Sequence, residues 1–304
     1  NAQTGTIAIG HQALTALTSG AGNVAIGYNA LLTEDDGDNC TAVGYEALKV
    51  QTGTTGTVGN TAMGWKSGVA VTTGTYNSLY GRMSGGALIG GSSNTFIGNY
   101  AGGNTTDVDK SVVIGAIAAN ANMTSDADGT VAIGYSALTA LTTGARNLAI
   151  GYTAADAMTQ GDDNIVIGYS AFGAAAAYDG IDRNVIIGNY AGDAINTTNV
   201  SDMVLIGYNA GTTTSHSNPA GTVAIGSYAL EDLTVGAKNV ALGYKAATDV
   251  TIGQYNHAIG YEALYTETVG DAATCFGYQA LYSQNSDVNN EDSANTAMGY
   301  AAGY

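Results

Sequence analysis

The segment NVAIGYNAL at residues 23–31 recurs, with small changes, seventeen times along the 304-residue chain. Its glycine marks each copy, and ten of the sixteen intervals between successive marker glycines are 17 residues; the others are 19, 20 or 22. A short period of this kind predicts a solenoid, in which each repeat is one structural unit that stacks on its neighbours. The marker glycines are Gly10, Gly27, Gly44, Gly64, Gly81, Gly98, Gly115, Gly134, Gly151, Gly168, Gly188, Gly207, Gly226, Gly243, Gly260, Gly277 and Gly299.

The residues before each marker glycine, which we number as position 0, predict a β-strand. Position −3 is usually β-branched, position −2 is Ala in ten repeats, and position −1 is always apolar. This composition and a length of about five residues favour a strand over a helix. We therefore predict an all-β parallel β-solenoid, or β-roll, of 17 coils with a basic 17-residue period, each coil holding two or three short strands. We expect a single repeat domain, residues 1–304, that is a segment of a longer fibre.

The alternation of side chains along a strand divides each repeat into two faces. Positions −3 and −1 share one face, and position −2 shares the other with the glycine. We assign the residues at −1 to the core of the coil: Ile9, Ile26, Ile97, Ile133, Ile150, Ile167, Ile225 and Ile259. The face at −2 is then a continuous apolar exterior that a second copy of the chain would cover. We predict this subunit interface at Ala25, Leu79, Phe96, Val113, Val166, Ile186 and Leu205.

Position −4 is asparagine in ten repeats. Asparagines at the same place in successive coils can stack as a ladder, with their amides bonded along the solenoid axis and to the backbone of the turn. Simple turn propensity is the alternative, but the fixed position in the repeat favours the ladder. Its predicted members are Asn23, Asn60, Asn77, Asn94, Asn147, Asn164, Asn184, Asn239, Asn256 and Asn295.

The motif at residues 23–31 and its relative NVALGYKAA at residues 239–247 resemble the head repeats of trimeric autotransporter adhesins. They are equally similar to the repeats of phage tail fibres and related bacterial surface fibres, and the resemblance covers essentially all seventeen repeats. It implies that each chain forms a left-handed parallel β-roll and that three chains pack about a common axis. The implied partner is therefore the chain itself, as a homotrimer.

Composition excludes several classes of protein. The net charge is −17 with only eight Lys and Arg residues, which argues against binding to nucleic acid because its phosphates would be repelled. Apolar runs are too short to span a membrane. An acidic, lysine-poor chain rich in glycine is typical of the extracellular space, a cell surface or a virion surface, and we expect this protein there.

The sequence contains few residues in patterns typical of a catalytic or metal-binding site. The three histidines, His11, His216 and His257, form no cluster, and no nucleophile elbow, phosphate loop or zinc spacing occurs, so we predict neither an enzyme nor a cofactor. Two acidic loops resemble fragments of calcium sites, but neither has the distant bidentate Glu that usually completes one, which favours solvated charge. Their weak calcium candidates are Asp35, Asp36, Asp38, Asp126 and Asp128.

We expect a structural or adhesive fibre segment, such as the rigid shaft or head of a trimeric surface adhesin or phage tail fibre. Such a rod could present weak multivalent contacts to a cell-surface glycan or protein receptor. Two alternatives remain open. One is an extracellular filament subunit that stacks end to end, and the other is an ice-binding solenoid, which would need a regular threonine face that position −3 supplies in only a few repeats.

Overall fold

The computed structural model describes residues 4–53, 56–174, 180–195, 200–212, 219–286 and 294–304. Two compact units follow one another along the chain, Asn1–Asn147 and Leu148–Tyr304. A single domain over residues 1–304 stays a prediction, and each unit is described here by itself. Both units are parallel β-solenoids, as the repeat predicts.

Each solenoid coil contributes one short strand to a continuous ladder. Unit 1 contains β1 (Ile7–Ile9), β2 (Val24–Ile26), β3 (Gly37–Asp38), β4 (Thr41–Val43), β5 (Gly56–Thr57), β6 (Thr61–Met63), β7 (Ser78–Tyr80), β8 (Thr95–Ile97), β9 (Val112–Ile114), the 3₁₀ turn η1 (Ser125–Ala127) and β10 (Val131–Ile133). Unit 2 contains β11 (Leu148–Ile150), β12 (Ile165–Ile167), β13 (Val185–Ile187), β14 (Val204–Ile206), β15 (Val223–Ile225), β16 (Val240–Leu242), β17 (His257–Ile259), β18 (Thr274–Phe276) and β19 (Thr296–Met298).

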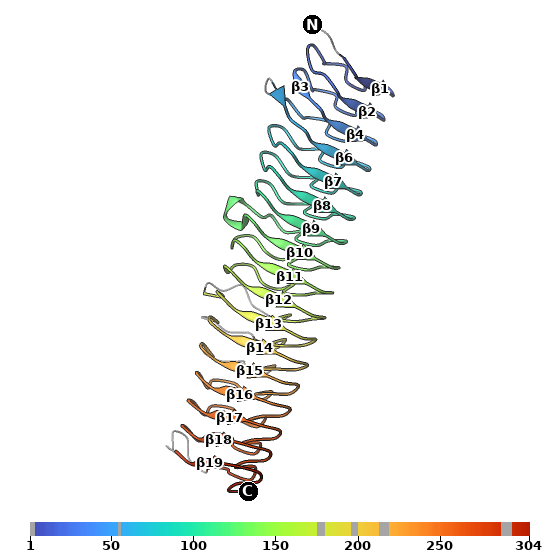
Figure 1. Cartoon of the computed structure of the whole chain (residues 1–304). Coiled ribbons are helices and arrows are strands. Elements are labelled where there is room, and N and C mark those ends of the chain that lie inside the picture. Colours follow the sequence, from blue (N-terminus) through green and yellow to red (C-terminus); the bar gives the residue numbers. More distant parts are fainter. Residues whose placement is uncertain (1–3, 54–55, 175–179, 196–199, 213–218, 287–293) are drawn as a thin grey trace. The chain divides into compact units, whose positions relative to one another are not determined.

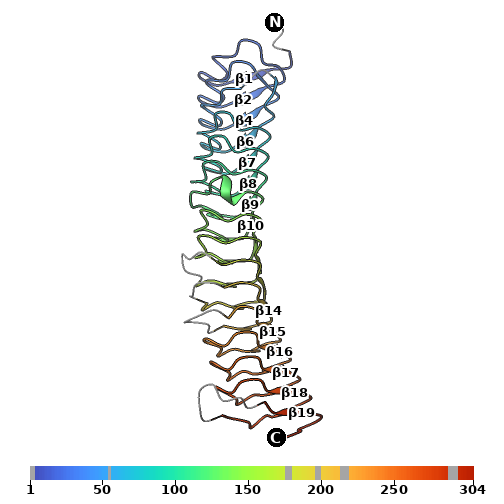
Figure 2. The same ribbon diagram turned by 90° about the vertical axis from the view of Figure 1, so that its left-hand side faces the viewer.

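The ladder keeps every repeat in the same register. Residues at equal distance from the marker glycine pair with one another, as Val112 with Val131 and Val204 with Val223. Figure 1 shows the strands of each unit following one another on one side of the coils. Figure 2, turned by 90°, shows them edge-on in single file within each unit. Outside this ladder, the described residues form one further strand pair, β3 with β5.

Most coils hold one strand of three residues, where we expected two or three strands, one of them about five residues long. The reason is a set of left-handed residues. Positions −5, +2 and +4 have positive φ in all seventeen repeats, including Asn29 and Leu31 of the opening motif. A strand requires extended backbone, so these positions end it and bend the chain into tight turns. The regular coil therefore closes within 17 residues through turns, and the long ladder among the described residues is the one before the glycine.

The marker glycine has a conformation that other residues rarely adopt. Its φ lies between 128° and 147° in every repeat. A Cβ at this position would overlap the carbonyl group of the marker glycine one coil further on, as Gly168 would overlap Gly188. The absence of a side chain thus sets how closely neighbouring coils approach.

Replacement of a marker glycine should therefore disrupt the stack. We expect Gly168→Ala to lower the free energy of unfolding by more than about 3 kcal/mol, because the backbone overlap adds to a strain of about 1–3 kcal/mol. The control is Gly221→Ala, at φ 71°, where the added Cβ meets only Lys238 at 3.5 Å. It should cost about 1 kcal/mol. Equal losses in chemical denaturation of the two variants would contradict this role for the marker glycine.

The structure reverses the predicted faces of the strand. Position −2 points into the coil, and the −1 isoleucines assigned to the core point out of it. Ile9, Ile26 and Ile97 are 59, 37 and 39% exposed, and Ile133, Ile150, Ile167, Ile225 and Ile259 are half-buried. The narrow coil explains the correction. Its interior already holds alanine at +3, larger apolar residues at +4 and +7, and the amide at −4, which leaves room mainly for alanine at −2.

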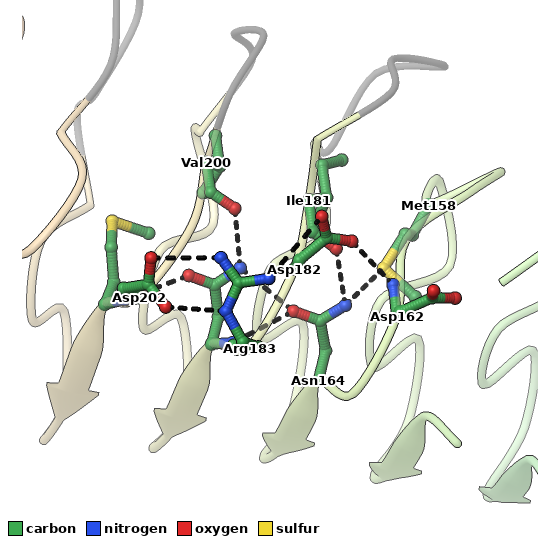
Figure 3. Close-up of polar contacts among 10 residues, drawn as sticks. Met158, Asp162, Asn164, Ile181, Asp182, Arg183, Val200 and Asp202 are labelled. Carbon is green, nitrogen blue, oxygen red and sulfur yellow. Dashed lines mark hydrogen bonds and ion pairs between the residues drawn. The ribbon is translucent and has the colours of Figure 1, made fainter. Parts of the chain in front are cut away.

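The −4 asparagines lie in this interior and join neighbouring coils. Asn164 donates from Nδ2 to the carbonyl of Ile181 at 2.7 Å, and its Oδ1 accepts from the backbone N–H and Nδ2 of Asn184 at 3.1 and 2.9 Å (Figure 3). An amide-to-amide bond of this kind also joins Asn94 to Asn77. Elsewhere the buried amides bond mainly to backbone groups, and Asn295, in the last coil, is exposed and donates to the side chain of Gln284. The asparagine row thus satisfies backbone groups that the left-handed turns leave inside the coil.

Removal of one such amide should be costly. Asn94 makes three bonds, to Val108, Asn77 and Ser111, at 2.6–3.0 Å. We expect Asn94→Ala to lower the free energy of unfolding by about 3 kcal/mol or more, since each buried group left unpaired costs about 1–3 kcal/mol. Asn99→Ala, an exposed asparagine of the same coil, should change it by less than about 0.5 kcal/mol. Similar urea midpoints for both variants would reject the buried-ladder role.

Candidate interaction surface

The outward face of the strands is the main candidate surface. Two rows of side chains, at positions −3 and −1, run along each unit with the same register as the backbone ladder. The side chains are chiefly Val and Ile, and several are well exposed, such as Met63 at 48%, Leu242 at 42% and Phe276 at 54%. At about 4.8 Å per coil, the eight ladder strands of unit 1 present a stripe on the order of 35 Å long. Below we refer to these two rows as the outer face.

The outer face carries no acidic or basic side chain. The chain has 25 acidic and eight basic residues, yet none occupies position −3 or −1 in any of the seventeen strands. His257 in β17 is the one histidine there. Isolated exposed apolar residues are ordinary, but a continuous uncharged stripe of this length is typical of a surface that another molecule covers.

A row of tyrosines at position +1 follows the outer face. Tyr28 stacks on Tyr45 with ring centroids 5.3 Å apart, and Tyr261 stacks on Tyr278 at 5.0 Å. His11 begins the row in unit 1 by stacking on Tyr28 at 5.1 Å. The tyrosines of the regular coils are 41–50% exposed, so their rings pack on one another and still keep an edge in solvent. The members are Tyr28, Tyr45, Tyr135, Tyr152, Tyr169, Tyr208, Tyr244, Tyr261 and Tyr278, followed by Tyr300, which is 80% exposed in the last coil.

The residues predicted to form the subunit interface are not on the surface. They stand at position −2 and are at most 1% exposed, because the strand turns this face toward the interior of its own coil. The corrected residues are Ala25, Leu79, Phe96, Val113, Val166, Ile186 and Leu205. A further copy could therefore contact the −3 and −1 rows but not these seven side chains.

The acidic loops stabilise the backbone of neighbouring coils. Asp38 and Asp128 occupy position −6, where each carboxylate accepts a hydrogen bond from the backbone N–H at the same position of the preceding coil, at 2.6 and 2.7 Å. Asp182 does the same for Asp162 at 2.9 Å (Figure 3). Asp36 instead accepts from Thr18 and Ser19, which lower its pKa, while Asp35 is exposed and Asp126 lies in η1. The described residues contain no group of three or more His, Cys, Asp or Glu side chains that could hold a metal ion.

Two buried glutamates form polar networks that the sequence analysis missed. Glu34 and Glu267 lie at position +7 and are 0% exposed, although this row of the core is otherwise mainly Leu, Val or Met. Each carboxylate accepts a backbone N–H three residues later at 2.7 Å and the side-chain amide of a glutamine in the next coil, at 2.7 Å in unit 1 and 2.9 Å in unit 2. Those glutamines, Gln51 and Gln284, bond in turn to a −4 asparagine at 2.9 Å.

Each network lies where a longer coil begins. These are the coil of 20 residues from Gly44 to Gly64 and the coil of 22 residues from Gly277 to Gly299. The networks supply the backbone of these longer turns with hydrogen-bond acceptors inside the coil. The signal that could have revealed them is the column at position +7, which is mainly apolar but carries Glu in one repeat and Gln in the next, at Glu34 and Gln51 and again at Glu267 and Gln284.

The pKa of Glu267 yields a prediction about acid stability. Burial acts to raise this pKa, but hydrogen bonds from Gln284, Gly270 and Ser286 outweigh burial and lower it below its usual value of 4.5. A lowered folded-state pKa means that the carboxylate stabilises the fold above about pH 4.5, and that this contribution is lost as the pH falls through the folded-state pKa. Glu267→Gln should be less stable than the wild type by about 1–3 kcal/mol at pH 7.

The difference between Glu267→Gln and the wild type should shrink below pH 4.5, as measured by urea denaturation from pH 7 to pH 3. Glu34→Gln should cost a similar amount at pH 7, because Glu34 makes the equivalent bonds. Asp35→Asn, in the exposed position next to Glu34, is the matched control and should be close to neutral. A stability difference for Glu267→Gln that stays constant down to pH 3 would contradict the proposed role of its charge.

Comparisons with known proteins do not narrow the function: no family model matches the chain, and comparison with curated proteins and with solved structures gives no significant match. The described part of the chain contains no helix with the length and hydrophobicity of a transmembrane segment. His216 lies outside the described residues. The function therefore has to be argued from the surface itself.

Proposed function

We propose that this chain is a structural, adhesive fibre segment in which copies of the chain associate through the outer face. The observation that carries the proposal is the uncharged double row of Val, Ile and related side chains at positions −3 and −1. Its register repeats in every coil, so two identical units can match row against row over many coils. The role is non-catalytic, and the fibre is exposed outside the cell or on a virion.

Three chains about one axis are the assembly we favour. The resemblance of the repeat to trimeric fibre heads suggests three chains. The outer face is also a narrow stripe, which suits contact around a shared axis better than the broad contact between two chains side by side. The distribution of charge supports the same arrangement. No Asp, Glu, Lys or Arg stands on the outer face, and the exposed charges elsewhere keep assembled fibres soluble and apart from one another.

Self-association can be tested by placing one charge on the outer face. The wild-type chain should have about three times the 30.5 kDa mass of one chain in light scattering or sedimentation at micromolar concentration. Ile97→Lys, 39% exposed on β8, should raise the dissociation constant at least tenfold, because burying an unpaired ammonium in an apolar contact is costly. Asn104→Lys makes a similar change at an exposed position of the same coil, away from the outer face, and should leave the mass unchanged. A monomeric wild-type chain would overturn the proposal.

Neither alternative has a supporting observation of its own. An ice-binding surface needs a regular threonine array, whereas the outer face has Thr only at scattered −3 positions such as Thr41, Thr61 and Thr95, beside Val, Met and Ile at −1. Measurement of thermal hysteresis would reveal that activity. End-to-end filaments would appear as long threads in electron micrographs, in place of discrete particles.

A further inference from the structure

In unit 2, some tyrosines near Gly188 and Gly226 change their position in the repeat and the orientation of their rings. At Gly188 and Gly226 the tyrosine stands at position +2, as Tyr190 and Tyr228, and their neighbours Tyr169, Tyr208 and Tyr244 remain at +1. The rings of Tyr190 and Tyr228 are turned by 72° from Tyr169 and by 86° from Tyr244. Tyr169 and Tyr244 themselves continue the ordinary stack, at 13° to Tyr152 and 21° to Tyr261.

This rotation changes which part of the ring is available to a ligand. In the regular stack, each tyrosine face is covered by the next ring about 5 Å away. A ring turned by roughly 90° directs its edge at its neighbours and its faces to the side. Tyr190 and Tyr228 are half-buried and two coils apart, about 10 Å along the axis. They therefore supply two sideways aromatic surfaces at a spacing close to the length of a disaccharide.

A shallow, open cavity of about 330 Å³ lies beside the first of these rings. It is lined by Tyr190, Asp193, Tyr208, Asn209 and Thr212, which come from the +1, +2 and +5 positions of two neighbouring coils. Its polar side chains can donate and accept hydrogen bonds, as an amide, a hydroxyl and a carboxylate do. An aromatic wall combined with a few polar groups, in a volume near the lower limit of small-molecule clefts, fits one or two sugar rings.

Positions +5 and +2 of the following coils also carry polar side chains, which lead from the cavity toward Tyr228. Glu231 stands at +5 of the next coil and accepts from Nδ2 of Asn209 at 3.4 Å. Lys245 follows at +2, with its Nζ 5.8 Å from the ring centre of Tyr228. Alternating aromatic and polar side chains thus run along the coils past both rotated tyrosines, which is the arrangement expected for a linear ligand.

The charges near the cavity favour a neutral ligand. Asp193 lines it, and Glu231, Asp232 and Asp249 follow within the next two coils, together with two lysines, Lys238 and Lys245. Burial raises the pKa of both Asp193 and Glu231. A sialylated, sulfated or phosphorylated glycan would add negative charge to this acidic surface, whereas neutral hydroxyl groups can bond to carboxylates and amides without that cost.

We propose that this open cavity and the side chains that follow it to Tyr228 form one groove in unit 2, which binds a linear neutral glycan with the two rotated tyrosines as stacking platforms and Asp193 and Asn209 as hydrogen-bond partners. The inference rests on the adhesive part of the proposed function. It adds a location, a ligand class and the residues responsible, and it does not require the outer face.

Titration calorimetry with maltohexaose, cellohexaose and mannohexaose tests this groove in the full chain, with a galacturonic acid hexamer as the anionic comparison. At least one neutral hexasaccharide should bind, and more tightly than the acidic hexamer. Tyr190→Ala and Tyr228→Ala should each weaken binding at least tenfold, which corresponds to about 1.4 kcal/mol. Tyr190→Phe keeps the ring and should retain most of the affinity.

Tyr278→Ala is the matched control, because Tyr278 lies within the regular stack between Tyr261 and Tyr300 at 5.0 and 5.1 Å. It should bind as the wild type does. Circular dichroism checks that the variants fold. The proposal is overturned if no neutral hexasaccharide binds at millimolar concentration, or if Tyr278→Ala weakens binding as much as Tyr190→Ala. The mass in solution reports on assembly separately, and Tyr190→Ala should leave it unchanged.

Discussion

The contact of one marker glycine with the next is the constraint on which the rest of the coil depends. The backbone carbonyl of Gly188 occupies the space where a side chain of Gly168 would be, and the same relation recurs along both units. Because coils approach this closely, residues of equal position stack directly above one another. A single change in the repeat, such as tyrosine at +1, therefore becomes a continuous row on the surface.

A narrow coil has little space for apolar side chains and many backbone groups to satisfy. Left-handed residues at three positions close the coil but leave N–H and C=O groups inside it. Asparagines at −4, aspartates at −6 and the buried pair Glu34 and Glu267 satisfy many of these groups. The −4 asparagines, and Asp38 and Asp128 among the calcium candidates, thus belong to the hydrogen bonding that joins the coils of the solenoid.

The two candidate surfaces arise from opposite properties of the same repeat. The outer face depends on regularity, since uncharged Val and Ile recur at −3 and −1 without interruption. The groove in unit 2 depends on a local departure, in which Tyr190 and Tyr228 move one position along the repeat and their rings turn. Assembly would use the part of the surface that every coil shares, and ligand recognition would use the coils that differ.

The sequence by itself determined the parallel β-solenoid and its register, because a 17-residue period with a glycine and an apolar strand in each copy has few other solutions. It also placed the asparagine row, since Asn94 and Asn164 recur at one fixed offset. Only the tertiary structure decided which strand face is inside. The alternation of side chains along a strand places Ile26 and Ala25 on opposite faces, but it does not say which face points into the coil. That depends on the width of the coil, which the left-handed turns set. Such turns at Leu31 or Tyr190 have no clear sequence signal, because these residues adopt positive φ only when the stacked coils hold them there.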